Sequence, residues 1–160
     1  MHTDKSVLDP CCGARKFYFN KEASCVLYGD IRDETYVQCD GRRLEVHPDM
    51  QMDFTALAFP NEHFALVFYD PPHLKYAGTD SFMRQAYGAL PPDDPIGYVV
   101  KGFTECWRVL RHEGTLIFKW NEDQIALGDL LSRLPVQPLI GNRRPKGARG
   151  QTFWMVFFKD

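Results

Sequence analysis

Short apolar runs alternate along the chain with stretches in which apolar residues recur every three or four positions. The runs of strand length lie at residues 7–8, 25–28, 50–52, 65–69 and 115–118. Apolar residues at helical spacing fill 94–111, ahead of Gly114 as a left-handed cap, and a second helix is expected over 121–134. This alternation predicts an α/β fold whose sheet carries helices on both faces.

Three segments are less regular. The stretch after Gly13 leaves room for at most two turns of helix before the next strand. Residues 30–53 carry turn signals but no helical period, so extended chain is expected there in place of a crossover helix. In the tail, strands at 136–140 and 152–158 flank a glycine-rich, basic loop and are expected to form an antiparallel pair.

Four of the predicted strands end at an aspartate. The four acids, in chain order, are Asp9, Asp30, Asp53 and Asp70. Ligands of open α/β sheets bind beyond the carboxyl ends of the strands, so these carboxylates are expected to line one crevice. Aspartate also caps helices, and capping explains any single position equally well. The repetition at successive strand ends favours the crevice.

The fourth of these strands leads into Asp70-Pro71-Pro72-His73. Two prolines fix φ and remove two backbone N–H donors, so this corner offers carboxylate and carbonyl acceptors only. Such a corner suits a substrate group rich in N–H donors, because an amine held by its hydrogens keeps its lone pair free to attack. Asp-Pro is also an ordinary turn, and the apolar strand before it is what favours a functional role.

The composition is that of one domain over residues 1–160. The chain is 44% hydrophobic and 14% aromatic, which suffices for a buried core. Its longest apolar runs are too short to span a membrane, so a soluble cytoplasmic protein is expected. The five cysteines form no CxxC pair and the histidines lack partners at ligand spacing, so no metal is expected. The net charge of −2 limits nucleic-acid binding to a local patch.

The order of these motifs resembles that of class I S-adenosylmethionine-dependent methyltransferases over essentially the whole chain. D-P-C-C-G at 9–13 looks like their first motif, and R-H-E-G-T-L at 111–116 is similar to the segment before their fifth strand. D-P-P-H at 70–73 resembles the D/N/S-P-P-aromatic motif of enzymes that methylate exocyclic amino nitrogens of nucleobases, and small phage and prophage relatives carry D-P-P-H. The resemblance implies a Rossmann-like sheet, mostly parallel with an antiparallel last strand, and S-adenosylmethionine as cofactor.

The resemblance also assigns roles to individual residues. Asp70, Pro71, Pro72 and His73 are the expected catalytic residues: the substrate amine donates to the Asp70 carboxylate and the Pro71 carbonyl, and His73 faces the substrate ring. The residues assigned to the cofactor are Asp9, Cys11, Gly13, Asp30 and Asp53, with Ile31 and Phe54 as apolar walls of an adenine slot. Asp30 suits the ribose hydroxyls, which donate hydrogen bonds.

Two positions depart from the family pattern. The usual G-x-G loop is Gly13-Ala14-Arg15 here, which restricts the approach of the backbone to the methionine part of the cofactor. His73 stands where most relatives have Tyr, Phe or Trp, and a histidine can stack, donate a hydrogen bond or titrate near neutrality. A dinucleotide is the alternative cofactor, but it requires a G-x-G-x-x-G loop that opens a helix, and this spacing is absent from the sequence.

Nucleic acid is the expected partner of this site. The residues assigned to the substrate are Lys75, Trp120, Arg143 and Arg144, with further positive charge at Arg42, Arg43, Lys146 and Arg149. Trp120 is chosen because it follows Lys119 at the carboxyl end of the fifth strand. A solvated surface loop explains the basic segment 141–150 equally well.

The sequence-based hypothesis is methyl transfer to adenine N6 or cytosine N4 in DNA or RNA. The chain has no segment long enough for a separate target-recognition domain, so a homo-oligomer, a partner subunit, or a single-stranded or RNA substrate would supply recognition. One alternative is a catalytically silent methyltransferase-like subunit that binds a partner or nucleic acid, which the altered glycine loop motivates. Another is a methyltransferase for a small molecule or a protein, because a fold does not choose its substrate.

Overall fold

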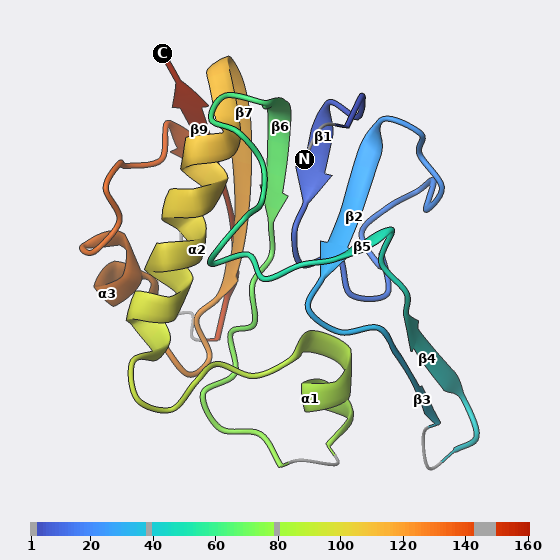
Figure 1. Cartoon of the computed structure of the whole chain (residues 1–160). Coiled ribbons are helices and arrows are strands. Elements are labelled where there is room, and N and C mark those ends of the chain that lie inside the picture. Colours follow the sequence, from blue (N-terminus) through green and yellow to red (C-terminus); the bar gives the residue numbers. More distant parts are fainter. Residues whose placement is uncertain (1–2, 38–39, 79–80, 143–149) are drawn as a thin grey trace.

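A mixed sheet of seven strands, in the order β5-β2-β1-β6-β7-β9-β8, organises the molecule (Figure 1). The computed structural model describes residues 3–37, 40–78, 81–142 and 150–160. The strands are β1 (Val7–Asp9), β2 (Val26–Asp30), β5 (Met50–Gln51), β6 (Phe64–Tyr69), β7 (Leu110–Asn121), β8 (Ile140–Gly141) and β9 (Thr152–Lys159). The first five in space, β5 to β7, pair in parallel, and β9 is antiparallel to β7 and β8. The expected α/β fold with an antiparallel last strand is confirmed.

The long helix α2 (Pro95–Val109) forms where helical spacing predicts it. The side chain of Asp94 caps its first turn by accepting a hydrogen bond from the Gly97 backbone N–H at 2.9 Å. Its apolar side chains, Phe103 among them, pack on β6 and β7, and Phe103 is fully buried beside Phe118 and Phe157. Burial of a side chain of this size stabilises the fold by about 1.5–3 kcal/mol. The apolar residues at helical spacing in α2 therefore explain why the helix packs on this face of the sheet.

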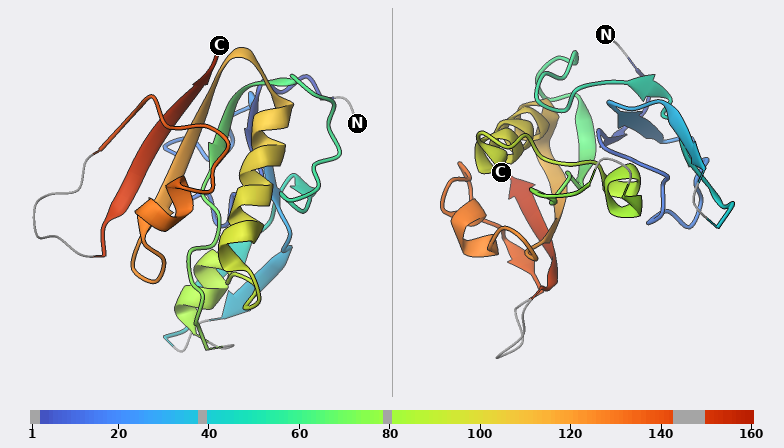
Figure 2. Two further views of the ribbon diagram at one scale, coloured as in Figure 1. Left: turned by 90° about the vertical axis from the view of Figure 1, so that its left-hand side faces the viewer. Right: turned by 90° about the horizontal axis from the view of Figure 1, so that it is seen from below.

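The expectation of helices on both faces of the sheet is wrong for the described residues. Helices α2 and α3 (Leu127–Leu131) lie on the same face, and α1 (Phe82–Tyr87) lies beyond the carboxyl ends of the strands (Figure 2). Residues 10–25, between β1 and β2, form turns and no helix. Phe17 and Tyr18 of this segment pack edge-on against Phe68 on the opposite face. A short connection rich in turn residues cannot supply a covering helix.

The chain between β2 and β5 is extended, as predicted, and forms a separate antiparallel hairpin of β3 (Glu34–Val37) and β4 (Arg43–Val46). The fifth predicted strand is longer than expected, because β7 begins directly after α2 and pairs with β9 from Gly114 to Asn121. The second predicted helix is therefore reduced to α3. The left-handed residue behind α2 is Glu113, with φ of 56°, and not Gly114.

Candidate active site at the carboxyl edge of the sheet

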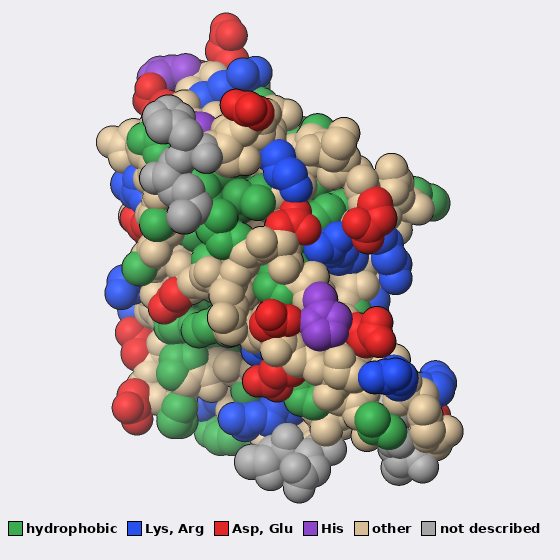
Figure 3. All heavy atoms as spheres, turned by 45° about the vertical axis from the view of Figure 1, so that its right-hand side comes forward, with side chains coloured by type: hydrophobic (Ala, Val, Ile, Leu, Met, Phe, Trp, Pro, Cys, Tyr) green, Lys and Arg blue, Asp and Glu red, His purple; other side chains and the backbone are tan. Residues whose placement is uncertain are grey.

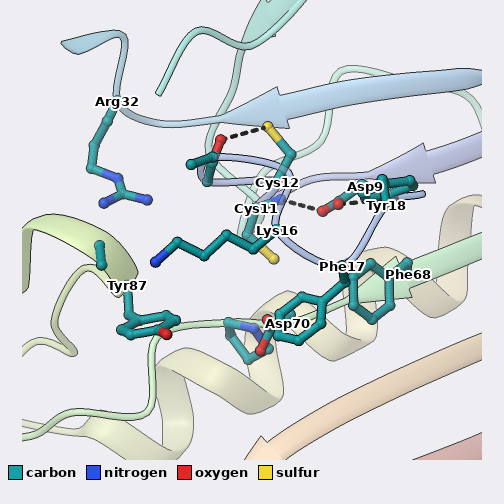
Figure 4. A pocket seen from close by; sticks show the side chains of 14 residues that line it. Asp9, Cys11, Cys12, Lys16, Phe17, Tyr18, Arg32, Phe68, Asp70 and Tyr87 are labelled. Atoms are coloured by element: carbon teal, nitrogen blue, oxygen red, sulfur yellow. Dashed lines mark hydrogen bonds between the residues drawn. The ribbon is translucent and has the colours of Figure 1, made fainter. Parts of the chain in front are cut away.

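Three adjoining cavities run along the carboxyl edge of the sheet. The first, which we call the slot, has a volume of about 300 Å³, and its walls include Pro10, Cys11, Ile31, Arg32, Phe54 and Tyr98. A narrow passage beside Asp9, Gly13 and Asp70 shares Cys11, Arg32 and Tyr87 with the slot (Figure 4). The outer cavity, of about 280 Å³, lies beyond the passage and is bounded by Phe17, His73, Met83, Tyr87, Lys119 and Trp154. The predicted crevice is thus a trough that crosses several strand ends.

The Asp70-Pro71-Pro72 corner faces this trough. Asp70 and Pro71 line the passage, and Asp70 and Pro72 line the slot. The Asp70 carboxylate is not free, because its Oδ1 accepts a hydrogen bond from Lys119 Nζ at 2.8 Å. Burial raises the pKa of Asp70 above its ordinary value, and the Lys119 ammonium opposes this shift. The second oxygen, Oδ2, accepts no hydrogen bond from the described residues and remains an acceptor for a ligand.

His73 is buried at the wall of the outer cavity, tilted against the ring of Tyr87 at 5.7 Å between centroids. Burial, together with the nearby Lys119 charge, lowers the pKa of His73 to about 4. The imidazole is therefore neutral at physiological pH, and the expectation that it could titrate near neutrality is wrong. It can still stack on a ring or form one hydrogen bond through each nitrogen.

Asp9 lies below the passage with 1% of its surface exposed. Its carboxyl group accepts hydrogen bonds from the Cys11 backbone N–H at 3.2 Å and the Tyr18 hydroxyl at 2.9 Å. Burial outweighs these hydrogen bonds and raises the pKa of Asp9 to about 8. At neutral pH, Asp9 is mostly protonated, so it shapes the floor of the passage without contributing a full charge.

The Asp30 carboxylate forms a salt bridge with the guanidinium of Arg32. Arg32 donates from Nε to Oδ1 at 2.9 Å and from Nη2 to Oδ2 at 3.0 Å, and the Gly13 backbone N–H donates to Oδ2 at 3.0 Å. The remaining Arg32 nitrogen, Nη1, donates to the Gln85 carbonyl in α1 at 2.8 Å. Arg32 therefore ties the end of β2 to α1, and a ribose hydroxyl can reach Asp30 only where Arg32 gives up part of this contact.

Phe54 and Ile31, the predicted walls of an adenine slot, both line the slot. Phe54 is 4% exposed and packs edge-on against Tyr98 at 5.0 Å between ring centroids, and Ile31 stands half-exposed at the rim. Asp53 lies next to Phe54 but does not line the slot. Its Oδ1 accepts a hydrogen bond from the Thr55 backbone N–H at 2.8 Å, which is the turn-forming role of aspartate.

Arg15 stands at the position of the second glycine of the usual G-x-G loop and adopts a left-handed conformation there. Gly13 and Arg15 both adopt left-handed conformations, with φ of 50° and 53°. The Arg15 side chain points away from the passage, donates to the His47 carbonyl at 3.1 Å and to Asp49 Oδ1 at 2.9 Å, and covers the Tyr28 ring at 3.9 Å. These contacts offset the cost of a left-handed non-glycine residue, which is roughly 1–2 kcal/mol. No helix follows the loop, which disfavours a pyrophosphate ligand.

Two substitutions of Arg15 separate the stabilisation by its guanidinium contacts from the cost of its left-handed backbone. We expect Arg15→Ala to lose about 1–3 kcal/mol of unfolding free energy, because the guanidinium contacts vanish while the left-handed backbone remains. Arg15→Gly loses the same contacts but relieves the backbone, so it is expected to be more stable than Arg15→Ala by about 1 kcal/mol. Urea unfolding of the three proteins measures both differences, and equal stability of the two variants would contradict a left-handed residue 15.

Trp120 is a core residue, and its assignment to the substrate is wrong. It is 1% exposed, and its Nε1 donates to the Ile125 carbonyl at 3.1 Å on the face that α2 and α3 cover. Successive side chains of a strand point to opposite faces, so it is Lys119 that points into the outer cavity. Lys75 lies outside the three cavities, with its backbone N–H bonded to Gln124. Arg143, Arg144, Lys146 and Arg149 lie outside the described residues.

Sequence reasoning missed several side chains of the trough, among them Phe17, Arg32, Tyr87 and Lys119. The alternation of β7 could have identified Lys119, because a lysine inside an apolar strand must face a polar partner. The signal for Arg32 was its position two residues after the strand-ending Asp30. Phe17 lies in the turns between β1 and β2, and Tyr87 ends the short helix α1; neither segment carries a periodic signal in the sequence.

One face of the molecule outside the trough carries mixed charge (Figure 3). On the face shown in Figure 3, acidic and basic side chains are interspersed around apolar areas. Among the described residues, no group of three or more His, Cys, Asp and Glu side chains could hold a metal ion. The described helices include none with the length and apolar character needed to cross a membrane.

No protein-family model matches the sequence, and no curated protein matches it. The structure is similar to the crystal structure of the PH0226 protein from Pyrococcus horikoshii OT3, with a TM-score of 0.52 and 14% sequence identity, over 96% of this chain and 81% of that chain. At this identity the likeness concerns the fold alone. The strand order, with its antiparallel end strands, matches the sheet topology of class I methyltransferases.

Proposed function

We propose that this chain transfers a methyl group from S-adenosylmethionine to an exocyclic amino nitrogen of a nucleobase in DNA or RNA. The observation that carries the proposal is the position of the Asp70-Pro71-Pro72 corner. It stands between the slot and the outer cavity, at the passage that joins them. A donor on one side and an acceptor on the other would meet at this corner, as in-line transfer requires.

The residues of the slot fit the adenosine part of the cofactor. Phe54, Tyr98 and Ile31 form apolar walls suited to a planar ring, and Cys11 joins the slot to the passage. Gly13 and Asp9 border the passage, where the methionine part would lie. The fit at Asp30 requires Arg32 to share its carboxylate with the ribose hydroxyls.

The protein's own contribution is alignment and exclusion of water. The bound cofactor supplies an electrophilic methyl group on a sulfonium. Asp70 Oδ2 and the Pro71 carbonyl accept hydrogen bonds from the amine, which keeps its lone pair available for attack. The neutral His73 and the rings of Phe17, Tyr87 and Trp154 offer flat apolar walls to the base.

Two measurements test the proposal in sequence. Calorimetric titration with S-adenosylmethionine asks whether the cofactor binds. Incubation with cofactor labelled in the methyl group, in separate pools of DNA, RNA, nucleotides and protein, then asks where the label goes. Label on adenine N6 or cytosine N4 is the expected result, and label on protein or on small molecules alone would overturn the nucleobase assignment.

The slot itself is tested by Tyr98→Ala. Loss of one aromatic wall is expected to weaken S-adenosylmethionine binding by roughly 10-fold, the equivalent of one well-placed aromatic contact. Tyr76→Ala is the matched control, because Tyr76 is 71% exposed and lies outside the three cavities. Equal affinity of the two variants, measured by calorimetry, would place the cofactor elsewhere.

A catalytically silent methyltransferase-like subunit is the second candidate. The observation that favours it is that both ligand-facing acids, Asp30 and Asp70, already pair with cations of the chain. In such a subunit Arg32 and Lys119 would replace ligand contacts permanently. The same calorimetric titration separates the candidates, because the silent subunit is expected not to bind the cofactor.

A further inference from the structure

Lys119 holds an unusual position for a lysine. It lies in β7, where residue 118 pairs with Tyr69 of β6 and residue 119 pairs with Trp154 of β9. This register places its ammonium between Asp70 and Trp154, at the wall of the outer cavity. Only 7% of the residue is exposed. Burying an ammonium costs free energy unless its N–H donors form hydrogen bonds, so each donor of Lys119 is expected to have an acceptor or to face solvent or a ligand.

The Lys119 ammonium has donors to spare. An ammonium carries three N–H donors. Among the described residues, Nζ forms one hydrogen bond, to Asp70 Oδ1, and otherwise lies over the ring of Phe17 at 4.6 Å. The remaining donors face a cavity of about 280 Å³. Lys119 therefore presents a donor to the outer cavity while it is bonded to Asp70, which lines the adjoining passage with Pro71. Asp70 Oδ2 and the Pro71 carbonyl, which accept no hydrogen bond from the described residues, are acceptors next to this donor.

A donor beside an acceptor matches a ligand edge that has an acceptor beside a donor. Adenine has this edge at N1 and its N6 amine, and cytosine has it at N3 and its N4 amine. An alkylammonium side chain has donors only and would leave Lys119 unsatisfied. The aromatic walls contributed by Phe17, Tyr87 and Trp154 add the requirement that the ligand be flat.

We propose that Lys119 is a specificity residue that donates a hydrogen bond to the ring nitrogen next to the reacting amine, N1 of adenine or N3 of cytosine. This inference rests on the proposed function and names the edge that the site reads. Base pairing uses the same two atoms in a duplex, so the substrate is an unpaired base, either single-stranded or flipped out of the helix.

The experiment compares bases that differ only at this nitrogen. Short thymine oligonucleotides carry a single adenine or 1-deazaadenine, and a second pair carries cytosine or 3-deazacytosine. Binding is followed by quenching of tryptophan fluorescence, because Trp154 lines the outer cavity. In at least one pair, the wild-type protein is expected to bind the natural base roughly 10–100-fold more tightly, the usual discrimination of a well-placed base contact.

Variants of Lys119 test whether this side chain causes the preference for the natural base. Lys119→Met is expected to bind both members of the pair equally, and Lys119→Arg keeps a donor and is expected to retain part of the preference. Lys101→Met is the matched control, because Lys101 is exposed on α2. Thermal unfolding identifies a variant that fails to fold, in which case Lys119→Arg and the wild-type comparison decide.

The inference is overturned by equal binding of both members of each pair by the wild-type protein, or by an unchanged preference in a folded Lys119→Met variant. Binding of a glutamine-containing peptide in place of every oligonucleotide would also overturn it. Methyl transfer is not needed for this measurement. A preserved preference without transfer would therefore support the recognition by Lys119 while counting against the proposed reaction.

Discussion

Methyl transfer by Asp70→Ala is expected to fall by roughly 100–1000-fold, the usual cost of removing one polar group that orients the reacting atoms. The Asp70 carboxylate supplies the free Oδ2 acceptor at the junction of the slot and the passage. Cofactor affinity should change much less, because the aromatic and apolar walls of the slot at Phe54, Tyr98 and Ile31 remain intact. Labelled transfer measures the first effect, and calorimetry with S-adenosylmethionine measures the second.

The controls for Asp70→Ala concern charge and folding. Asp70→Asn keeps a carbonyl acceptor and a partner for Lys119, so it is expected to retain more activity than Asp70→Ala. Loss of the carboxylate also leaves the Lys119 ammonium unpaired, and thermal unfolding must show that the variant is folded. Asp129→Ala, on the exposed side of α3, should behave like the wild-type protein. Full transfer activity in a folded Asp70→Ala would exclude the corner from the reaction.

Asp9→Asn is expected to make the protein more stable than the wild type at pH 8, with an advantage that disappears near pH 4. The folded pKa of Asp9 is about 8 because the carboxyl group is buried, against 3.8 without the protein environment. Between these values the native state binds more protons than the unfolded state. Raising the pH therefore lowers the unfolding free energy, by up to about 1.4 kcal/mol per pH unit. An asparagine does not titrate, so its variant does not lose unfolding free energy in this way as the pH rises.

Urea unfolding at several pH values checks this prediction. Part of the advantage is offset, because the asparagine amide keeps only one acceptor oxygen for the Cys11 N–H and the Tyr18 hydroxyl. Asp93→Asn is the matched control, since Asp93 is exposed next to the start of α2, and it should follow the wild-type curve. Parallel curves for wild type and Asp9→Asn from pH 4 to pH 8 would show that Asp9 does not change its protonation there.

The spacing of apolar residues in the sequence by itself determined the strands and the helix whose apolar side chains are buried in the core. Strands β1, β2 and β6 and the helix α2 lie where apolar spacing predicts them, because burial of their side chains stabilises the same local conformation that the spacing favours. Asp9 and Asp30 are the last residues of β1 and β2, and Asp70 and the double proline follow β6 directly, because aspartate and proline favour turns over the interior of a sheet.

Only the tertiary structure decided which of those groups are free to meet a ligand. Asp30 and Asp70 are paired with Arg32 and Lys119, and Trp120 is turned into the core, because the register of β6, β7 and β9 sets which side chains face each other. The absence of a described helix on the second face of the sheet has the same origin. Contacts between residues distant in sequence depend on strand register and on irregular loops, and neither leaves a periodic trace in the chain.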